Sequence, residues 1–231
     1  MKIGILSAMS KEHKQLTAML TNAHEEQDGR YTFVCGHLGA NTLILLQCGI
    51  GKVNAAIGTA ELIKTFSPQC IISTGVAGGI DTSLSIMDVV VSRQICYHDV
   101  WCGMGCEYGQ IQGMPTFFNG NPRLIEKALQ LNDLQQTTKI HAGLICTGDQ
   151  FISDQAELRK IKDHFPEGLA CDMESAAIAQ TCYLFQKPFV SFRIISDTPG
   201  ADNHADQWTD FWGEMAQRSF AITLAYLNNL D

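Results

Sequence analysis

The chain has 231 residues, of which 45% are hydrophobic, and a net charge of −8 from 24 acidic and 16 basic residues. This length and hydrophobic content exclude a disordered protein and predict one α/β domain, residues 1–231, with a substantial core. The basic residues are scattered along the chain, which argues against nucleic acid as a partner because such binding requires a basic surface.

Apolar runs and cysteines indicate the compartment. No apolar run approaches the ~20 residues of a transmembrane helix, so we expect no membrane partner. Lys11 and Glu12 interrupt the apolar start, which is not typical of a signal peptide. The nine cysteines lie mostly within apolar runs and fit reduced thiols better than a secreted disulfide framework. We therefore expect a soluble, cytoplasmic protein.

The first third of the chain alternates between strand and helix patterns. The expected elements are a strand over 2–7, a helix over 11–20 with Ser10 as its N-cap, a polar turn over 21–30, strands over 31–35 and 42–48, a helix over 53–65 that Pro68 prevents from continuing, and a strand over 70–74. A glycine-containing, hairpin-like connection joins the second and third of these strands.

The rest of the chain continues this alternation. We expect strands over 89–96, 140–146 and 189–195, helices over 122–131 and 156–164, a strand that runs into a helix over 168–185, and a last helix within 208–228. Residues 97–119 show no period, and a stretch this long is usually functional or a contact region. Residues 148–152 form a loop, and 197–206 are polar. The prediction is a mixed, mostly parallel sheet with one early antiparallel element and helices on both faces.

Three acids follow predicted strands. Glu174 stands where a strand runs into a helix, near unpaired amides and the positive end of the helix dipole. Asp197 and Glu12 follow two other apolar runs, and ligands bind at such strand ends in open α/β sheets. Each acid alone fits a cap or a helix-start residue. Together with Arg193, which needs a partner inside an apolar run, they favour a site. A purely structural ion pair between Arg193 and Asp197 is the alternative.

Two glycine-rich stretches also end predicted strands. Residues 49–52 lack the spacing of a phosphate-binding loop, and residues 74–79 do not match the dinucleotide-binding pattern. Both are compatible with a tight turn that needs positive φ, and with backbone amides that approach a ligand closely. The aromatic residue that most favours stacking on a ligand is Phe151, because it lies in a predicted loop.

A metal site is not expected. His98 and Asp99 lie near Cys102 and Cys106, but the spacing of the two cysteines and the missing fourth ligand do not fit a zinc site.

Eight segments in this order resemble the 5′-methylthioadenosine/S-adenosylhomocysteine nucleosidases: residues 4–9 with Glu12, and residues 48–53, 74–79, 97–99, 107–110, 148–152, 172–174 and 193–197. The resemblance implies a nucleoside phosphorylase-like fold, a homodimer and a small-molecule adenine nucleoside as substrate. The implied reaction is irreversible hydrolysis of the adenine N-glycosidic bond, which needs no metal or organic cofactor.

The resemblance also implies roles for individual residues. Glu12 is the general base for water, and Arg193 helps to hold that water. Asp197, supported by Ser196, is the acid that protonates adenine N7. Glu174 binds the ribose hydroxyls beside Met173, the backbone around Ile152 reads the adenine edge, and Phe151 stacks on the base. The remaining residues expected to line the substrate site are Met9, Ile50, Val76, Ala77, Gly78 and Asp172.

In that family, the loop after residue 99 reaches into the partner subunit's site and lines the pocket for the 5′-substituent. We therefore expect loop 100–115 to contribute Met104, Cys106, Met114 and Pro115 to the neighbouring site. This sulfur-rich set suits a thioether, and it leaves the preference among 5′-groups open. Val76 stands where many relatives carry serine.

Glu12 separates hydrolysis from phosphorolysis, because a carboxylate at the nucleophile position repels phosphate and favours water. The alternatives are a phosphate-dependent purine nucleoside phosphorylase, a futalosine-type hydrolase and a nucleoside-binding sensor without turnover. A sensor has no need of a general base, so the intact set of Glu12, Glu174 and Asp197 argues against it.

Overall fold

A ten-stranded mixed sheet forms the centre of the computed structural model, which describes residues 1–134, 138–198, 206–207 and 216–230. The strands are β1 (Lys2–Ser7), β2 (Thr21–Asp28), β3 (Tyr31–Leu38), β4 (Asn41–Gln47), β5 (Cys70–Gly79), β6 (Val89–Tyr97), β7 (Phe118–Asn119), β8 (Ile140–Thr147), β9 (Gly168–Asp172) and β10 (Phe189–Asp197). The helices are α1 (Ser10–Thr17), α2 (Lys52–Phe66), α3 (Pro122–Leu129), α4 (Leu131–Leu134), α5 (Gln155–His164), α6 (Ser175–Leu184) and α8 (Ala216–Asn228).

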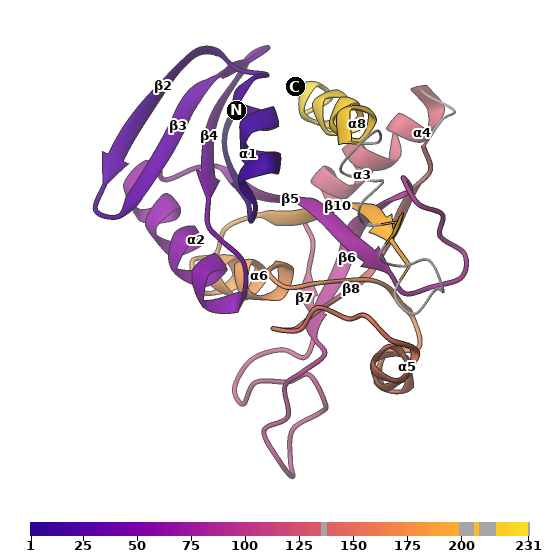
Figure 1. Cartoon of the computed structure of the whole chain (residues 1–231). Coiled ribbons are helices and arrows are strands. Elements are labelled where there is room, and N and C mark those ends of the chain that lie inside the picture. Colours follow the sequence, from indigo (N-terminus) through magenta and orange to yellow (C-terminus); the bar gives the residue numbers. More distant parts are fainter. Residues whose placement is uncertain (135–137, 199–205, 208–215, 231) are drawn as a thin grey trace.

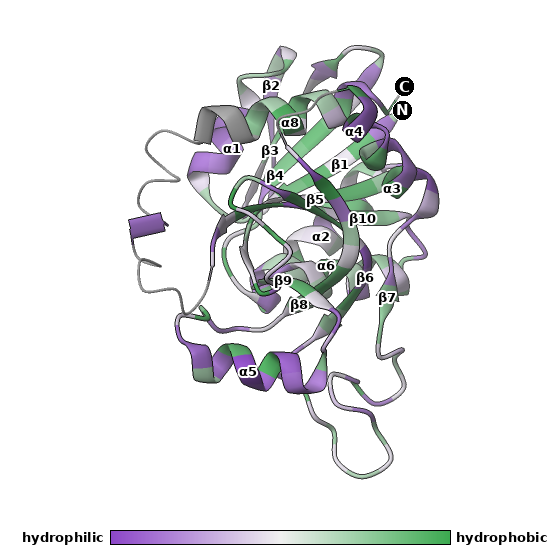
Figure 2. Cartoon of the chain, turned by 90° about the vertical axis from the view of Figure 1, so that its right-hand side faces the viewer, coloured by the Kyte–Doolittle hydropathy of each residue, from purple (hydrophilic) through white to green (hydrophobic). Residues whose placement is uncertain are grey.

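The sheet closes on itself at one end. Its order is β10-β6-β8-β9-β5-β1-β4-β3-β2, and β10 also pairs with β5, so five strands form a closed ring (Figure 2). Pairing is parallel along β4-β1-β5-β10 and along β6-β8-β9. Antiparallel pairs β6–β10 and β5–β9 join these two groups into the ring. The sheet is mixed, as predicted, but antiparallel pairing extends well beyond the early element that the sequence indicates.

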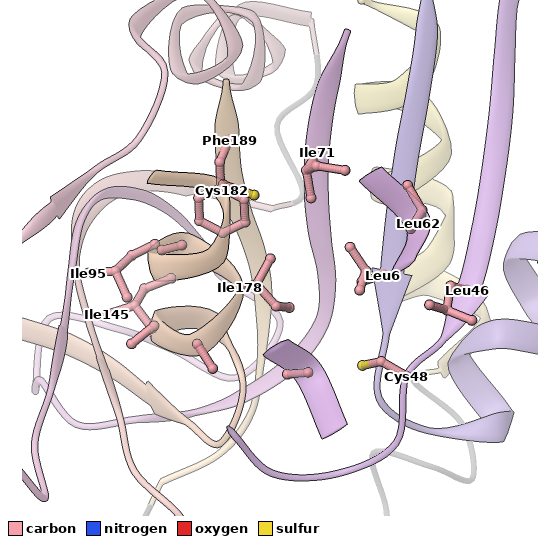
Figure 3. Close-up of a cluster of buried hydrophobic side chains, with 14 of the residues drawn as sticks. Leu6, Leu46, Cys48, Leu62, Ile71, Ile95, Ile145, Ile178, Cys182 and Phe189 are labelled. Atoms are coloured by element: carbon pink, nitrogen blue, oxygen red, sulfur yellow. The ribbon is translucent and has the colours of Figure 1, made fainter. Parts of the chain in front are cut away.

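Helices cover both faces of the sheet (Figure 1). Helices α2 and α6 pack on one face, where the core shown in Figure 3 includes Leu6, Leu46, Leu62, Ile71, Ile178 and Phe189. Helices α1, α3 and α8 cover the other face with a second core that includes Ile3, Ile5, Leu16, Leu124 and Phe220. Successive residues of β1 thus point to opposite faces and are buried on both, which explains its unbroken apolar run.

Several boundaries differ from the prediction. Residues 21–30, expected as a turn, contain the strand β2, whose residues are all exposed and which pairs with β3 at the edge of the sheet. The polar side chains are compatible with an edge strand and give no alternation to detect. Helix α1 begins at Ser10 and has Met9 as its N-cap, so Ser10 is not the cap. The helix predicted over 122–131 ends earlier, as α3, and a separate short helix, α4, follows it.

Strand β5 extends to Gly79, so the glycine-rich stretch 74–79 is part of the sheet. It pairs with β10 and β9, and it is not a turn. In the last part of the chain, 199–205 of the predicted polar segment and 208–215 of the predicted helix lie outside the described residues. Among those described, no helix combines the length and hydropathy needed to cross a bilayer.

Candidate active site

One cavity of about 150 Å³ lies at or just beyond the C-terminal ends of β1, β5, β9 and β10. Its lining consists of Ala8, Met9, Glu12, Ile50, Val76, Ala77, Gly78, Gln150, Phe151, Ile152, Cys171, Asp172, Met173, Glu174, Arg193, Ser196 and Asp197. The structure therefore brings together the three acids that follow predicted strands, and places Arg193 with them.

Glu12 is a buried acid at the start of α1, with 1% of its surface exposed. Its Oε2 accepts a hydrogen bond from the Met9 amide at 3.0 Å, as in a capping box, and its Oε1 accepts from the Val76 amide at 3.2 Å. Burial raises the pKa of Glu12, and the two amides and Arg193 oppose this increase. Glu12 thus has the position of a helix-start acid but is enclosed in the cavity.

Gly75 allows Glu12 and Arg193 to come close. A Cβ atom at this position would lie 2.6 Å from Glu12 Oε1 and 2.6 Å from Arg193 Nη1. Any side chain here would displace one of these charged groups, so the glycine in the middle of β5 is required by the site.

Arg193 is 2% exposed and has several partners. Its Nε lies 2.9 Å from Asp172 Oδ2, and its Nη2 lies 3.8 Å from Glu174 Oε2. Nη2 also donates to the Ser73 hydroxyl at 2.9 Å and to the Ser175 hydroxyl at 3.2 Å. Burial acts to lower the pKa of Arg193, but the surrounding carboxylates outweigh it and raise the pKa. The guanidinium remains charged inside the protein.

Asp172 holds Arg193 in place. Its Oδ1 accepts from the Thr147 hydroxyl at 2.6 Å, and both of its carboxylate oxygens accept from the Ser175 amide at 3.3 Å. Asp172 therefore lines the cavity while its oxygens are engaged with protein groups. The buried hydroxyls of Thr147, Ser175 and Ser73 were not among the predicted site residues. The feature of the sequence that could have indicated them is that each is a polar residue within or close to an apolar strand.

Glu174 is the N-cap residue of α6, but its side chain makes no capping bond to that helix. Its Oε1 accepts instead from the amide of Gly51, the N-cap residue of α2, at 3.0 Å. Burial raises the pKa of Glu174 to about 7, with Asp172 and Glu12 adding to the increase and Arg193 and Gly51 opposing it. The sequence-based alternative that Glu174 is a cap is thus wrong for its side chain.

Asp197 ends β10 and is 2% exposed. The hydroxyl of Ser196 donates to Asp197 Oδ1 at 2.5 Å. Ile152 forms another part of the wall and is 5% exposed, whereas Phe151 is 55% exposed. The cavity thus has acids inside and an accessible aromatic side chain among its lining residues.

Four predicted binding residues lie outside this cavity: Met104, Cys106, Met114 and Pro115. Their loop projects from the body of the protein below β7 and β8 in Figure 1. Met104 is fully exposed, and Met114 packs against the core on the α6 face. Conversely, Ala8, Gln150 and Cys171 line the cavity without having been predicted, although each adjoins a predicted residue.

A possible metal site lies elsewhere. In the part of the chain that the structure describes, potential ligand atoms of three residues converge within 4.8 Å at His24, Glu26 and Cys35 on β2 and β3. Two of the three are exposed at the edge of the sheet, and none lines the cavity.

Comparison with known proteins supports a family relationship. Residues 2–228 match the phosphorylase superfamily. The chain is 45% identical over 226 residues to the 5′-methylthioadenosine/S-adenosylhomocysteine nucleosidase of Staphylococcus aureus, covering 97% of this chain and 98% of that protein. The crystal structure of the Colwellia psychrerythraea nucleosidase with adenine is similar, with a TM-score of 0.93, 38% identity and coverage of 100% and 96%. The crystal structure of the Streptococcus pyogenes S-adenosylhomocysteine nucleosidase with 5-methylthiotubericidin is also similar. Its TM-score is 0.94 at 39% identity, and the match covers 100% of this chain and 98% of that one.

Proposed function

This chain belongs to the phosphorylase superfamily and within it to the 5′-methylthioadenosine/S-adenosylhomocysteine nucleosidases, and on that premise we propose its reaction. It hydrolyses the N-glycosidic bond of 5′-methylthioadenosine and S-adenosylhomocysteine, which releases adenine and the 5′-substituted ribose. The observation that carries this proposal is the convergence of Glu12, Glu174 and Asp197 on one cavity.

The chemistry needs acids on both sides of the bond. The bond breaks through an oxocarbenium-like state, in which positive charge develops on the ribose while the leaving adenine must gain a proton. Carboxylates near the sugar stabilise the charge, and an acid near the base supplies the proton. No step in this scheme requires a metal or an organic cofactor.

Glu12 is the proposed general base for the attacking water. Its Oε1 and Arg193 Nη1 both border the space beside Gly75, where a water bound between them could be oriented and deprotonated. An anion such as phosphate would meet the Glu12 carboxylate in the same place. This repulsion favours hydrolysis over phosphorolysis.

Glu174 is the proposed acceptor for the ribose hydroxyls, with Met173 beside it. Its Oε1 is held by the Gly51 amide, while Arg193 is 3.8 Å from its Oε2. The carboxylate thus faces the cavity from a fixed position. We place the sugar between Glu12 and Glu174, with Met9, Ile50 and Val76 as neighbouring contacts.

Asp197 is the proposed acid for adenine N7, and Ser196 orients its carboxyl group. The backbone around Ile152 would read the adenine edge, and Phe151 would stack on the base. Ala77 and Gly78 complete the proposed contacts. The Asp172 carboxylate acts through Arg193.

The oligomeric state is also a proposal. A homodimer in which loop 100–115 enters the neighbouring site would cover Trp101 and Met104, which are 66% and 101% exposed in one chain. It would place Cys106, Met114 and Pro115 near the 5′-substituent. Light scattering should then give twice the 25.4 kDa of one chain. We further propose a cytoplasmic location, since seven of the nine cysteines are buried free thiols.

The function is tested by offering the purified protein a panel of 5′-substituted adenosines, with and without phosphate, and detecting free base by chromatography. We expect adenine from methylthioadenosine and adenosylhomocysteine at a rate that phosphate does not change. Strict phosphate dependence with ribose-1-phosphate as product would identify a phosphorylase. Preferential cleavage of futalosine would identify that hydrolase, and tight binding without any release of base would identify a sensor.

A further inference from the structure

A partly buried ion pair lies just outside the cavity, between Lys52 and Asp99. Lys52 Nζ is 2.9 Å from Asp99 Oδ1 and 2.8 Å from Oδ2, and the two side chains are only 23% and 18% exposed. Lys52 is the first residue of α2, and Asp99 follows the end of β6. Neither residue lines the cavity, so the pair has no direct contact with a ligand there.

The pair continues into the loop that forms one wall of the cavity. Asp99 Oδ2 accepts a hydrogen bond from the Asp149 amide at 2.9 Å. Asp149 Oδ1 in turn accepts from the Lys52 amide at 2.8 Å. These three residues form a closed circuit of charge-assisted bonds. Asp149 immediately precedes residues 150–152, which line the cavity on the side proposed for the base.

The same end of α2 also bonds to a second part of the cavity lining, Glu174. The Gly51 amide donates to Glu174, and the next amide, that of Lys52, donates to Asp149. The first amides of a helix have no partners within it and favour carboxylates. Gly51 has φ of +93°, and a Cβ there would approach Asp149 Oδ1 to 3.1 Å. The start of α2 therefore joins two carboxylates from different segments.

Lys52 supplies the positive charge that this arrangement needs. Its Nζ lies 3.9 Å from Asp149 Oδ2 as well as close to Asp99, and 5.4 Å from the centre of the Tyr97 ring. Tyr97 is fixed by a 2.6 Å hydrogen bond to Gln180 of α6. Without the ammonium group, the neighbouring carboxylates of Asp99, 18% exposed, and Asp149, 46% exposed, would repel each other.

We propose that Lys52 and Asp99 are positioning residues, which set the spacing between the base wall at residues 150–152 and the turn whose Gly51 amide orients Glu174. The roles of these two parts of the lining rest on the proposed function. A nucleoside spans both parts, so loosening the pair should impair binding and turnover of the whole nucleoside more than binding of free adenine. Displacements of about 1 Å can cost on the order of 10²-fold in rate.

Hydrogen exchange tests the geometry without reference to activity. In Lys52→Met, the Gly51 and Asp149 amides should exchange faster than in the ligand-free wild type. The control is Lys64→Met, the same substitution on the same helix at a 58% exposed lysine paired with Glu61. It should leave both amides unchanged. Unaltered exchange at both amides in Lys52→Met would overturn the proposal, whether or not the protein hydrolyses nucleosides.

Kinetics test the consequence. We expect Lys52→Met to lower kcat/KM for methylthioadenosine about 10- to 100-fold, while inhibition by adenine changes much less and Lys64→Met behaves as wild type. The Gly51 bond lowers the pKa of Glu174, so its loss should move the acidic limb of the pH–rate profile to higher pH. The positioning role would be contradicted if the loss of activity merely matched the loss of folded protein measured by circular dichroism and the acidic limb of the pH–rate profile did not shift.

A conservative variant provides the rescue. Asp99→Asn retains an acceptor for Lys52 or Asp149, so it should keep more activity than Asp99→Ala. Equal losses in the two variants, with slow exchange at the Asp149 amide in both, would count against the inference. An inactive wild-type enzyme would refute the proposed function, and the exchange data would still decide the geometry.

Discussion

Glu12 and Arg193 come together beside Gly75, where a single Cβ atom would lie 2.6 Å from a charged atom of each. The base proposed for water and the cation proposed to hold it are thus neighbours only because β5 carries no side chain at this position. The arrangement accounts for a glycine in the middle of a buried strand, where it would otherwise weaken the sheet.

Gly75→Ala should therefore reduce activity by at least about 10²-fold, because a displaced Glu12 or Arg193 can no longer orient the water. Gly29→Ala is the matched control, since Gly29 also has positive φ but a Cβ there would meet nothing within 4 Å. It should cost about 1 kcal/mol of stability and leave kcat/KM unchanged. Full activity of Gly75→Ala would show that the contact is not needed.

The raised pKa of Glu174 predicts how stability varies with pH. Its pKa increases from an ordinary 4.5 to about 7 on folding, so the folded state binds the proton more tightly. The corresponding stability is complete below pH 4.5 and is lost as pH rises through 7. The glutamine of Glu174→Gln does not titrate. Between pH 4.5 and pH 8, the free energy of unfolding of this variant relative to that of the wild type should therefore increase by up to about 3 kcal/mol.

Urea unfolding of both proteins at the two pH values measures this difference. Glu61→Gln, a partly exposed acid on α2, controls for the loss of one negative charge. A stability difference between Glu174→Gln and wild type that is the same at both pH values would contradict the pKa increase.

Asp197→Asn should act on turnover. Asparagine can still accept the hydrogen bond from Ser196 but cannot supply a proton to the base, so kcat should fall about 10²- to 10⁴-fold. Affinity for a non-hydrolysable adenosine analogue should change only a few-fold. Ser196→Ala removes the orienting hydroxyl alone and should have a smaller effect on kcat. If Asp197→Asn kept the wild-type kcat, another residue would have to protonate adenine.

Much of the fold could be predicted because buried parallel strands are continuous apolar runs. β1 is such a run, while β6, β8 and β10 are mostly apolar with a few polar residues inside. The acids just after β1 and at the end of β10 mark the edge where ligands bind. The edge strand β2 has no apolar face and was therefore expected as a turn. Closure of the ring by β6 and β10 depends on pairing between residues slightly more than 100 positions apart, such as Phe192 and Val91, which local patterns do not encode.

The three acids of the site could be predicted from the sequence, but the residues that hold the site in place could not. Glu12, Glu174 and Asp197 each follow a strand, so their convergence follows from the topology. The sequence suggested only Asp197 as an ion-pair partner of Arg193, whereas packing brings Asp172 to 2.9 Å from its Nε. The Lys52–Asp99 pair joins residues 47 apart and has no sequence signature.

The most direct test compares Glu12→Gln with the wild type in phosphate-free buffer, by measuring adenine release from methylthioadenosine beside calorimetric binding of an adenosine analogue. Glutamine fills the same space but cannot take a proton from water. The variant should bind the analogue and lose about 10²- to 10⁴-fold in turnover. If Glu12→Gln released adenine at the wild-type rate, Glu12 would not be the base.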